Sequence, residues 1–399
     1  MNPLGWQLLL GLAVAGGLLI AINAAVELGE RRGLISTYRG PDDFVRYADE
    51  PVFGQTADGQ WLTTTPYGRK TMVPSRFRRQ KRENGWRMFV LGGSFAMGSP
   101  YTHQLHDTER SGGIASWLRD QLAADYPESE IEVLNAATGA QNSSRVRRIA
   151  DQVVNFDPDV LLVLTCNNEG ALPPGVVTEQ LRRFGGFRLM MRLMAPLEDG
   201  LERSHYTAQD APTAALREVF RENIRAILAA AEARGVPILL GTLPVNLRYT
   251  GEEVVHTLSD EGAFRGVAAL EVIEPPPGEA ARRKLEEFEE HGPLEALRRL
   301  GLELYRQGDY EHARHVLEQH TELAPYNRCR PSFNEIIREE AVRAANAALV
   351  DLEERARALS PHGVPGGELF LDYCHMNREG YAAMAEAILE ALREYDLGP

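Results

Sequence analysis

Short apolar runs alternate with amphipathic stretches along most of the chain after residue 85. Runs rich in Val, Ile and Leu predict buried strands at 87–93, 131–137, 158–169, 236–244 and 346–354. Apolar residues three and four positions apart predict helices at 111–126, 143–156, 213–235 and 377–395. Continuously apolar strands that alternate with helices are typical of a parallel sheet covered on both faces. The pattern therefore predicts an α/β fold with one five-stranded parallel sheet.

Two segments depart from the alternation and are interpreted as insertions. The first, 170–212, carries Pro, Gly and Met, and the second, 245–332, is longer and highly charged. Part of the second, about 294–327, resembles a tetratricopeptide helix pair, in which small residues let two helices approach closely. The residues that fit are Leu300, Gly301, Gly308, Tyr310, Ala313, Leu317 and Pro325, whereas His320 replaces the usual small residue. A single such unit is expected to pack on the main domain.

The N-terminus is apolar and uncharged. No charged side chain occurs from Met1 to Val26, and a helix needs about 20 apolar residues to cross a bilayer. Residues 4–26 therefore predict a membrane anchor, with a cleaved signal peptide and a buried core helix as the alternatives. Arg31 and Arg32 follow this run, and the positive-inside rule would place the rest of the chain in the cytoplasm.

Composition narrows the classes of function. The chain has 399 residues with 43 Lys and Arg against 57 Asp and Glu, a net charge of −14. This balance argues against nucleic-acid binding, which depends on neutralising phosphates. The cysteines Cys166, Cys329 and Cys374 match no zinc spacing. Cys166 and Cys374 both lie beside candidate catalytic residues, and they are interpreted as small apolar fillers, with a disulfide between them as the alternative.

The stretch "MFVLGGSFAMGSPY" ends the first predicted strand on two glycines and Ser94. A phosphate cradle would need a Gly-Lys-Ser/Thr ending or three glycines in a G-x-G-x-x-G spacing, and neither is present. The other interpretation is a turn that presents a nucleophile. Functional crevices in such sheets lie at the carboxyl ends of the strands, where Ser94, Asn135 to Gly139, and Asn168 all fall.

The residues of a serine nucleophile site occur in the sequence. "LFLDYCHMNREGY" places Asp372 and His375 three positions apart, just before the last predicted helix. A serine hydroxyl needs a base to take its proton, and the base needs a carboxylate to hold its tautomer. Ser94, His375 and Asp372 supply these roles. The Asn168 amide and backbone N–H groups at Ser94 and near Ala140 are candidates for an oxyanion hole.

The blocks "VLGGSFAMG", "VLNAATGAQNSS", "LTCNNE" and "DYCHMNREGY" resemble those of the SGNH (GDSL-like) hydrolase superfamily, in particular membrane-anchored bacterial members with a tetratricopeptide-like insertion. The resemblance covers roughly residues 86–395. It implies a three-layer, flavodoxin-like sheet, with Ser94, Asp372 and His375 as catalytic residues. It places the oxyanion hole at Ser94, Asn168 and the second-block glycine position, which is Ala140 here, with Gly139 beside it. Gly93 and Cys166 also depart from residues common in the family.

The resemblance implies an esterase or O-acyltransferase that acts through an acyl-serine, most readily on acetyl esters of a cell-envelope carbohydrate. The alternative is a non-catalytic assembly protein that binds a partner, such as a membrane protein, through its helical insertion. No metal, cofactor or nucleic acid is expected. Anchored members usually work outside the cytoplasm, which conflicts with the orientation that the positive-inside rule gives for Arg31 and Arg32. A periplasmic domain is predicted. The expected layout is an anchor at 1–28, a linker and polar segment at 29–85, and a hydrolase-like domain at 86–399.

Overall fold

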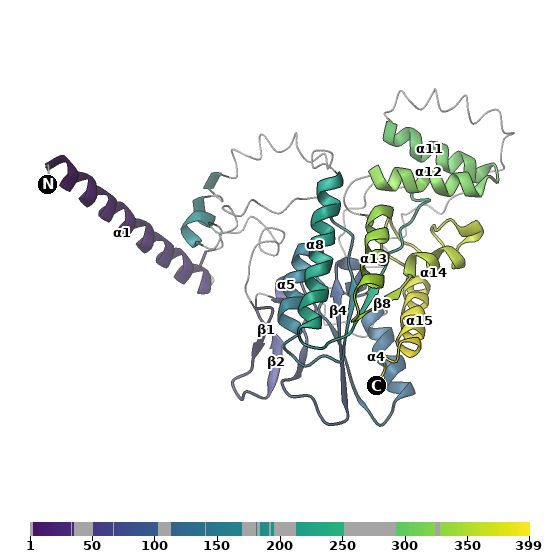
Figure 1. The fold of residues 1–399 in the computed structure, drawn as a ribbon, viewed down its shortest axis with the longest axis horizontal. Coiled ribbons are helices and arrows are strands. Elements are labelled where there is room, and N and C mark those ends of the chain that lie inside the picture. Colours follow the sequence, from purple (N-terminus) through teal and green to yellow (C-terminus); the bar gives the residue numbers. More distant parts are fainter. Residues whose placement is uncertain are drawn as a thin grey trace. The chain divides into compact units, whose positions relative to one another are not determined.

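A computed structural model gives the fold of the chain (Figure 1). It describes residues 3–32, 34–35, 51–66, 68–102, 113–139, 141–169, 181, 184–190, 193–194, 213–250, 293–323 and 328–399. The chain divides into two compact units. One comprises Met1–Asp49 with Leu172–Asp210, and the other Glu50–Ala171 with Ala211–Pro399.

The second unit is built on a five-stranded sheet with the strand order β5-β4-β6-β7-β8, and all its neighbouring strands are parallel. Its strands are β4 (Gly85–Gly92), β5 (Glu130–Asn135), β6 (Val160–Leu164), β7 (Ile238–Gly241) and β8 (Ala347–Val350). Numbered along the sheet, this is the 2-1-3-4-5 order of doubly wound folds, in which the direction of strand addition reverses between the first and third strands. The predicted parallel sheet is confirmed, and its switch point lies between β4 and β6.

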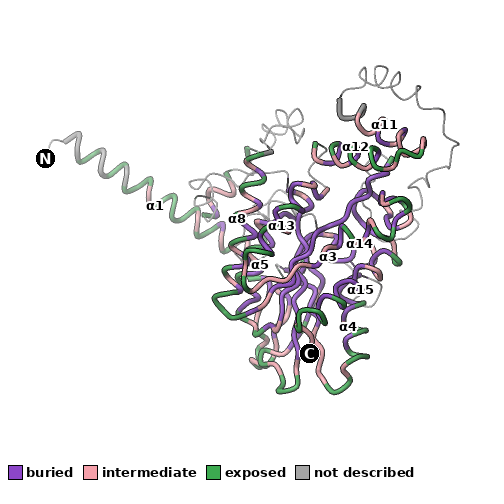
Figure 2. Tube along the Cα trace, turned by 45° about the vertical axis from the view of Figure 1, so that its right-hand side comes forward, coloured by how far each residue is buried: buried purple, intermediate pink, exposed green. Residues whose placement is uncertain are grey.

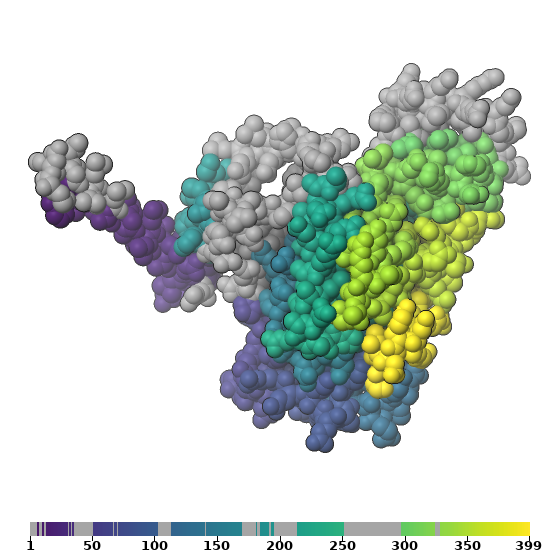
Figure 3. All heavy atoms as spheres, viewed as in Figure 1, coloured from purple at the N-terminus to yellow at the C-terminus, as the bar shows by residue number. Residues whose placement is uncertain are grey.

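Helices cover both faces of this sheet. On one face α5 (Ser143–Val153), α8 (Thr213–Glu232) and α13 (Pro331–Arg343) lie side by side. The space-filling view shows α8 and α13 in contact along much of their length (Figure 3). On the other face lie α4 (Ile114–Asp125), α14 (Leu352–Leu359) and α15 (Arg378–Glu394), and the buried strands run between the two groups (Figure 2).

Burial on both faces explains why the strands have unbroken apolar sequences. Met88, Phe89, Val90 and Leu91 are successive residues of β4, and each has no exposed surface. In a strand covered on one side only, every second residue would face water. Each fully buried side chain of this size contributes roughly 1.5–3 kcal/mol of transfer free energy, so the central strand anchors the fold.

A smaller antiparallel sheet precedes the main one, where the sequence predicts only a linker and polar segment. It consists of β1 (Phe53–Gln55), β2 (Trp61–Thr64) and β3 (Arg76–Arg78). Phe53 and Phe77 are buried, and both rings pack against Phe89 of the main sheet. Strands of three or four residues are too short to show a clear period-2 pattern, so the sequence does not reveal them.

The described part of the long insertion is a helix pair, α11 (Pro293–Arg306) and α12 (Tyr310–Leu323), which pack on each other. A side chain at Gly301 would collide with Leu317, so glycine permits the close approach. Residues 251–292 and Pro325 lie outside the described residues. A helix pair occurs in the predicted range, and its tetratricopeptide-like character stays a prediction.

The first unit contains α1 (Pro3–Arg31). Its segment Ala13–Glu30 is long and apolar enough to cross a membrane, a property shared by signal sequences and buried core helices. Side chains along it are exposed rather than buried, with Ile20 73% exposed. A core helix would hide these side chains, so the exposure disfavours that alternative for the described residues.

Residues 185–190, part of the first predicted insertion, are helical and pack near the end of α1. Val26 is 4% exposed and lies against Gly185. Arg188 forms salt bridges with Glu27 and Glu30, at 3.4 and 2.5 Å. These contacts attach the described part of the insertion to α1 within the same unit.

Candidate active site

The two glycines before Ser94 allow the chain to turn tightly at the end of β4. A Cβ atom on Gly92 would collide with the backbone oxygen of Leu164 in β6, so only glycine permits this approach of the two strands. Gly93 then precedes the short helix α3 (Ser94–Met97). In the first turn of a helix the backbone N–H groups have no intrahelical partner. The Ser94 N–H is therefore available beside its own hydroxyl.

The Asp-x-x-His segment forms a tight hairpin before α15. Phe370 and Met376 form an antiparallel bridge at its base, and the Leu371 N–H donates to the His375 oxygen at 2.8 Å. The hairpin brings the side chains of Asp372 and His375 to the same side, as the spacing predicts.

Ser94, His375 and Asp372 form a continuous hydrogen-bonded chain. The His375 Nε2 atom lies 2.8 Å from Ser94 Oγ, and its Nδ1 atom lies 2.7 Å from Asp372 Oδ2. The other carboxylate oxygen, Oδ1, accepts from the backbone N–H groups of Cys374 and His375 at 2.8 and 2.6 Å. Asp372 and His375 are buried, whereas Ser94 is half-buried among buried neighbours. The nucleophile candidate is therefore the member of the chain that reaches the surface.

The electrostatics of the pair match this arrangement. Burial raises the pKa of the Asp372 carboxyl, but His375 and the two backbone N–H groups outweigh burial and hold that pKa below its ordinary value. Burial lowers the pKa of His375, and the Asp372 carboxylate outweighs this effect and raises that pKa well above its ordinary value. His375 is thus a stronger base than a free histidine, and Asp372 stays ionised beside it.

Asn168 lies where its amide faces the nucleophile turn. It follows β6 in a left-handed backbone conformation with φ of 67°, which asparagine tolerates better than most residues. Its Nδ2 atom lies 3.7 Å from the position of a Cβ atom built on Gly93 and 3.5 Å from the Gln141 oxygen. Like Ser94, Asn168 is half-buried between buried neighbours. The geometry places this candidate donor beside Gly93, the residue before the serine.

The other predicted oxyanion positions are Gly139 and Ala140. The Gly139 N–H donates to the Thr71 oxygen at 3.3 Å, so it is engaged in a backbone hydrogen bond. Ala140 lies outside the described residues. Of the predicted oxyanion donors, the backbone N–H of Ser94 and the amide of Asn168 therefore remain as candidates among the described residues.

Asn246 positions the hairpin and was not predicted from the sequence, which assigns it to the long insertion. Its side-chain amide donates to the backbone oxygen of Asp372 at 2.9 Å, and its backbone N–H donates to the Tyr373 oxygen at 3.0 Å. The residue is buried and follows β7. The sequence indicated this residue only as an asparagine at a strand end. It did not indicate the partner, because the contact joins residues 126 positions apart.

Glu169 similarly supports the loop that carries Asn168. Its carboxylate accepts from the backbone N–H and the hydroxyl of Ser143 at 2.6 and 2.9 Å. Ser143 is the first residue of α5, where a helix favours a negative charge. A buried glutamate directly after the asparagine pair was the only indication in the sequence.

The structure corrects the expectation for the cysteines. Cys166 is disulfide-bonded to Cys329, while Cys374 carries a buried free thiol. Cys329 lies beside Arg330, the residue that precedes α13. The bond therefore ties the start of α13 to the segment that leads into Asn168. The alternative of a Cys166–Cys374 disulfide is wrong because Cys166 is bonded to Cys329. Cys374 is a small buried side chain, as the filler interpretation expects.

Donor atoms of Asp372, Cys374 and His375 lie within 4.8 Å of one another, a set that could in principle hold a metal ion. Burial raises the pKa of the Cys374 thiol, which disfavours the thiolate that a metal requires. The Asp372 and His375 atoms are already hydrogen-bonded to each other. The arrangement of these described residues suits proton transfer better than metal binding.

No family model matches the chain, and no curated protein matches it. Solved structures give distant matches. An acetyl xylan esterase, AlAXEase, is 15% identical over 77% of this chain and 99% of its own, with a TM-score of 0.38. A lipase/acylhydrolase from Enterococcus faecalis is 11% identical over 78% and 96%, with a TM-score of 0.36. A single-residue variant of Axe2, an acetyl xylan esterase from Geobacillus stearothermophilus, is 12% identical over 80% and 98%, with a TM-score of 0.40. Similarity at this level carries no argument about chemistry, which depends here on the geometry of the site.

Proposed function

We propose that the protein is a serine esterase or O-acyltransferase with Ser94, His375 and Asp372 as its catalytic residues. The observation that carries the proposal is the pair of hydrogen bonds at His375, 2.8 Å to Ser94 and 2.7 Å to Asp372. The first of these contacts joins side chains that are 281 positions apart in the sequence. They fall at the switch point of a doubly wound sheet, where ligands bind in such folds.

The reaction follows from the geometry. The Ser94 oxygen attacks the ester carbonyl carbon while His375 Nε2 takes the hydroxyl proton, and Asp372 stabilises the resulting imidazolium. The carbonyl oxygen gains the negative charge, which the Asn168 amide and the Ser94 N–H stabilise in this proposal. Collapse breaks the bond to the leaving alkoxide, which receives the proton from His375 and leaves an acyl-serine. Water or a sugar hydroxyl, deprotonated by His375, then takes the acyl group and restores Ser94.

The substrate class and the family rest on the four sequence blocks that resemble the SGNH superfamily. On this basis the acyl group is an acetyl group and its carrier a cell-envelope carbohydrate.

The proposed location is outside the cytoplasm, with α1 as an uncleaved anchor. The exposed apolar surface of α1 supports a membrane helix. The Cys166–Cys329 disulfide supports an oxidising compartment, since such bonds are rare in cytosolic proteins. This observation outweighs Arg31 and Arg32, which favour the opposite orientation by the positive-inside rule.

A fluorophosphonate probe tests the catalytic role, because it reacts with a serine only where a base activates the hydroxyl. Wild-type protein is expected to be labelled at Ser94 and to hydrolyse or transfer acetyl from an aryl acetate. Ser94→Ala should abolish both activities and keep the unfolding midpoint, since a half-exposed turn residue contributes little stability. Ser99→Ala, a nearby serine outside the triad, is the labelling control. A folded wild-type chain that resists the probe would instead favour the non-catalytic, partner-binding alternative.

A further inference from the structure

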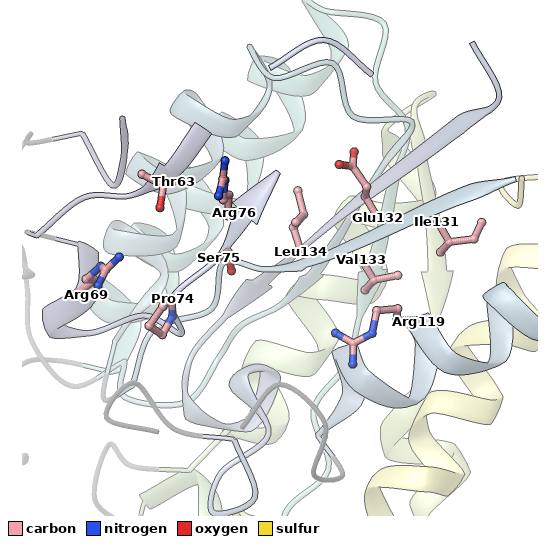
Figure 4. Close-up of a pocket in the computed structure, with 10 residues that line it drawn as sticks. All are labelled: Thr63, Arg69, Pro74, Ser75, Arg76, Arg119, Ile131, Glu132, Val133 and Leu134. Carbon is pink, nitrogen blue, oxygen red and sulfur yellow. The ribbon is translucent and has the colours of Figure 1, made fainter. Parts of the chain in front are cut away.

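A cavity of about 450 Å³ lies in the second unit beside β5, the outer edge strand of the main sheet (Figure 4). Its lining comes from β5, from β2, from the first residue of β3 and the segment before it, and from α4. The lining residues are Thr63, Arg69, Pro74, Ser75, Arg76, Arg119, Ile131, Glu132, Val133 and Leu134. None of them belongs to the proposed catalytic site.

The cavity is a gap between two strand-like segments that approach each other at both ends. Met72 forms an antiparallel bridge with Thr138 at one end. At the other end the Arg78 N–H donates to Glu132 Oε1 at 3.4 Å. Residues 72–78 therefore run antiparallel to β5 but separate from it in the middle. These two contacts bound the gap along β5.

The two edges present backbone hydrogen-bonding groups to the gap. The Ala136 N–H donates to the Val90 oxygen in β4. Along β5 the backbone groups of every second residue therefore point toward β4, and those of the residues between point away from it. By this alternation Ile131 and Val133 direct their N–H and C=O groups away from β4, toward the cavity. Among the described residues no backbone partner for these outward groups occurs. Buried backbone groups are usually paired, so a ligand or water is expected against Val133, which is 6% exposed.

The charge of the lining is positive in an acidic protein. Residues 69–87 contain eight Lys and Arg and a single acidic residue, Glu83, whereas the whole chain has a net charge of −14. Glu132 forms a 2.7 Å salt bridge with the buried Arg87, which offsets the negative charge of Glu132. Arg69 and Arg119 lie toward opposite ends of the lining, with Pro74, Ser75 and Leu134 between them (Figure 4).

The acidic partners of these arginines leave an excess of positive charge. Arg119 contacts the neighbouring Asp120 at 3.4 Å. Arg69 and Arg76 form no salt bridge with any residue that the structure describes, although Arg76 stacks over Trp61, with its guanidinium carbon 4.5 Å from the ring. Arg76 affects the pKa of Asp58, which is an exposed residue. That pKa is lowered mainly by the Thr56 hydroxyl and only in smaller part by Arg76. An anionic ligand would give Arg69 and Arg76 a partner of opposite charge.

We propose that this cavity binds the oxyanion group, carboxylate or phosphate, of a small polar molecule such as an acidic sugar unit. The guanidinium groups of Arg69 and Arg76 bind the anion, since guanidinium matches the geometry of both oxyanions. The outward N–H group of Val133 binds a further oxygen of the ligand. The site is separate from Ser94 and does not depend on the catalytic proposal.

The fluorescence of Trp61 provides the measurement, because Arg76 lies directly over its ring. The full chain in mild detergent is titrated with glucuronate, inorganic phosphate and glucose. A saturable change is expected with at least one anion and not with glucose, and added sodium chloride should weaken the binding. Glucuronate alone would identify a carboxylate site, phosphate alone a phosphoryl site, and both a general oxyanion site. Trp61→Phe should remove the signal, which assigns it to this residue rather than to Trp6, Trp86 or Trp117.

The variants decide whether binding occurs in the cavity. Arg69→Gln with Arg76→Gln should raise the dissociation constant at least tenfold, measured by calorimetry so that the readout does not depend on Trp61. Arg79→Gln, an exposed arginine next to β3 but outside the lining, is the matched control and should bind as wild type. Ser94→Ala should also bind normally. Equal unfolding midpoints would show that the variants fold. Absence of binding by either anion, or equal affinity of the double variant and the Arg79 control, would overturn the proposal.

Discussion

Cys166 and Cys329 form a disulfide although 163 positions separate them, and their Cα atoms lie 4.9 Å apart. Both residues are buried. Because Cys166 lies two residues before Asn168, the bond holds the start of α13 against the segment that carries a candidate oxyanion donor. The disulfide therefore links the stability of the fold to the geometry of the site.

The disulfide is expected to stabilise the fold measurably. Cys166→Ala with Cys329→Ala should lower the free energy of unfolding by about 2–5 kcal/mol, the usual effect of removing a native disulfide. Denaturant titration measures this, and wild-type protein in reductant should behave like the variant. Thiol counting is the control: without reductant the unfolded chain should expose Cys374 alone. Three reactive thiols before reduction would show that the bond does not form.

Loss of the Asn168 amide should slow turnover without removing the nucleophile. Asn168→Ala is expected to keep fluorophosphonate labelling at Ser94 and to lower the acyl-ester turnover rate about 10²–10³-fold, the usual cost of one oxyanion donor. Asn168→Asp keeps the shape but replaces the donor with a negative charge, so it should be at least as slow. Steady-state kinetics on an aryl acetate measures both variants. Turnover near the wild-type rate in Asn168→Ala would exclude the amide from the oxyanion hole.

The activity should rise with pH, because His375 acts as a base only in its neutral form. The Asp372 carboxylate raises the pKa of His375, so the rising limb should lie above the range of an ordinary histidine. Asp372→Asn removes this effect and should move the limb to lower pH, while the maximal rate falls about 10⁴-fold because the imidazole tautomer is no longer held. The rate of fluorophosphonate labelling against pH measures the shift. A limb that stays in place in Asp372→Asn would contradict the pairing.

Removal of α1 should release a folded domain. The sheet and the candidate site belong to the second unit, whereas α1 belongs to the first. A chain that lacks residues 1–30 is expected in the soluble fraction with probe labelling retained, while the full chain stays with the membrane after carbonate washing. If the truncated chain is insoluble or unfolded, α1 contributes to the core and the anchor prediction fails.

Local sequence patterns determined much of the fold. Fully apolar strands predict burial on both faces, and β4 to β8 follow the predicted runs. The last helix also begins where the sequence indicates, because Asn377 caps α15 by accepting from the Gly380 N–H at 2.8 Å. Placement of Ser94 and Asn168 near one edge followed from the rule that parallel strands end together. The three-residue spacing of Asp372 and His375 predicted that one turn presents both side chains. These features depend on neighbours a few residues apart, which a sequence records directly.

The contacts across long distances were decided by the tertiary structure alone. The sequence suggests only Cys166 and Cys374 as a possible pair, and the Cys166–Cys329 bond exists because α13 begins beside the end of β6. Asn246 meets Asp372 because β7 ends beside the hairpin. The cavity near Arg69 exists because two segments that meet at Met72 and Arg78 diverge between them. Each of these contacts depends on which surfaces the packed core brings together. Contacts between residues far apart in the chain produce no periodic pattern in the sequence, so the sequence alone does not reveal them.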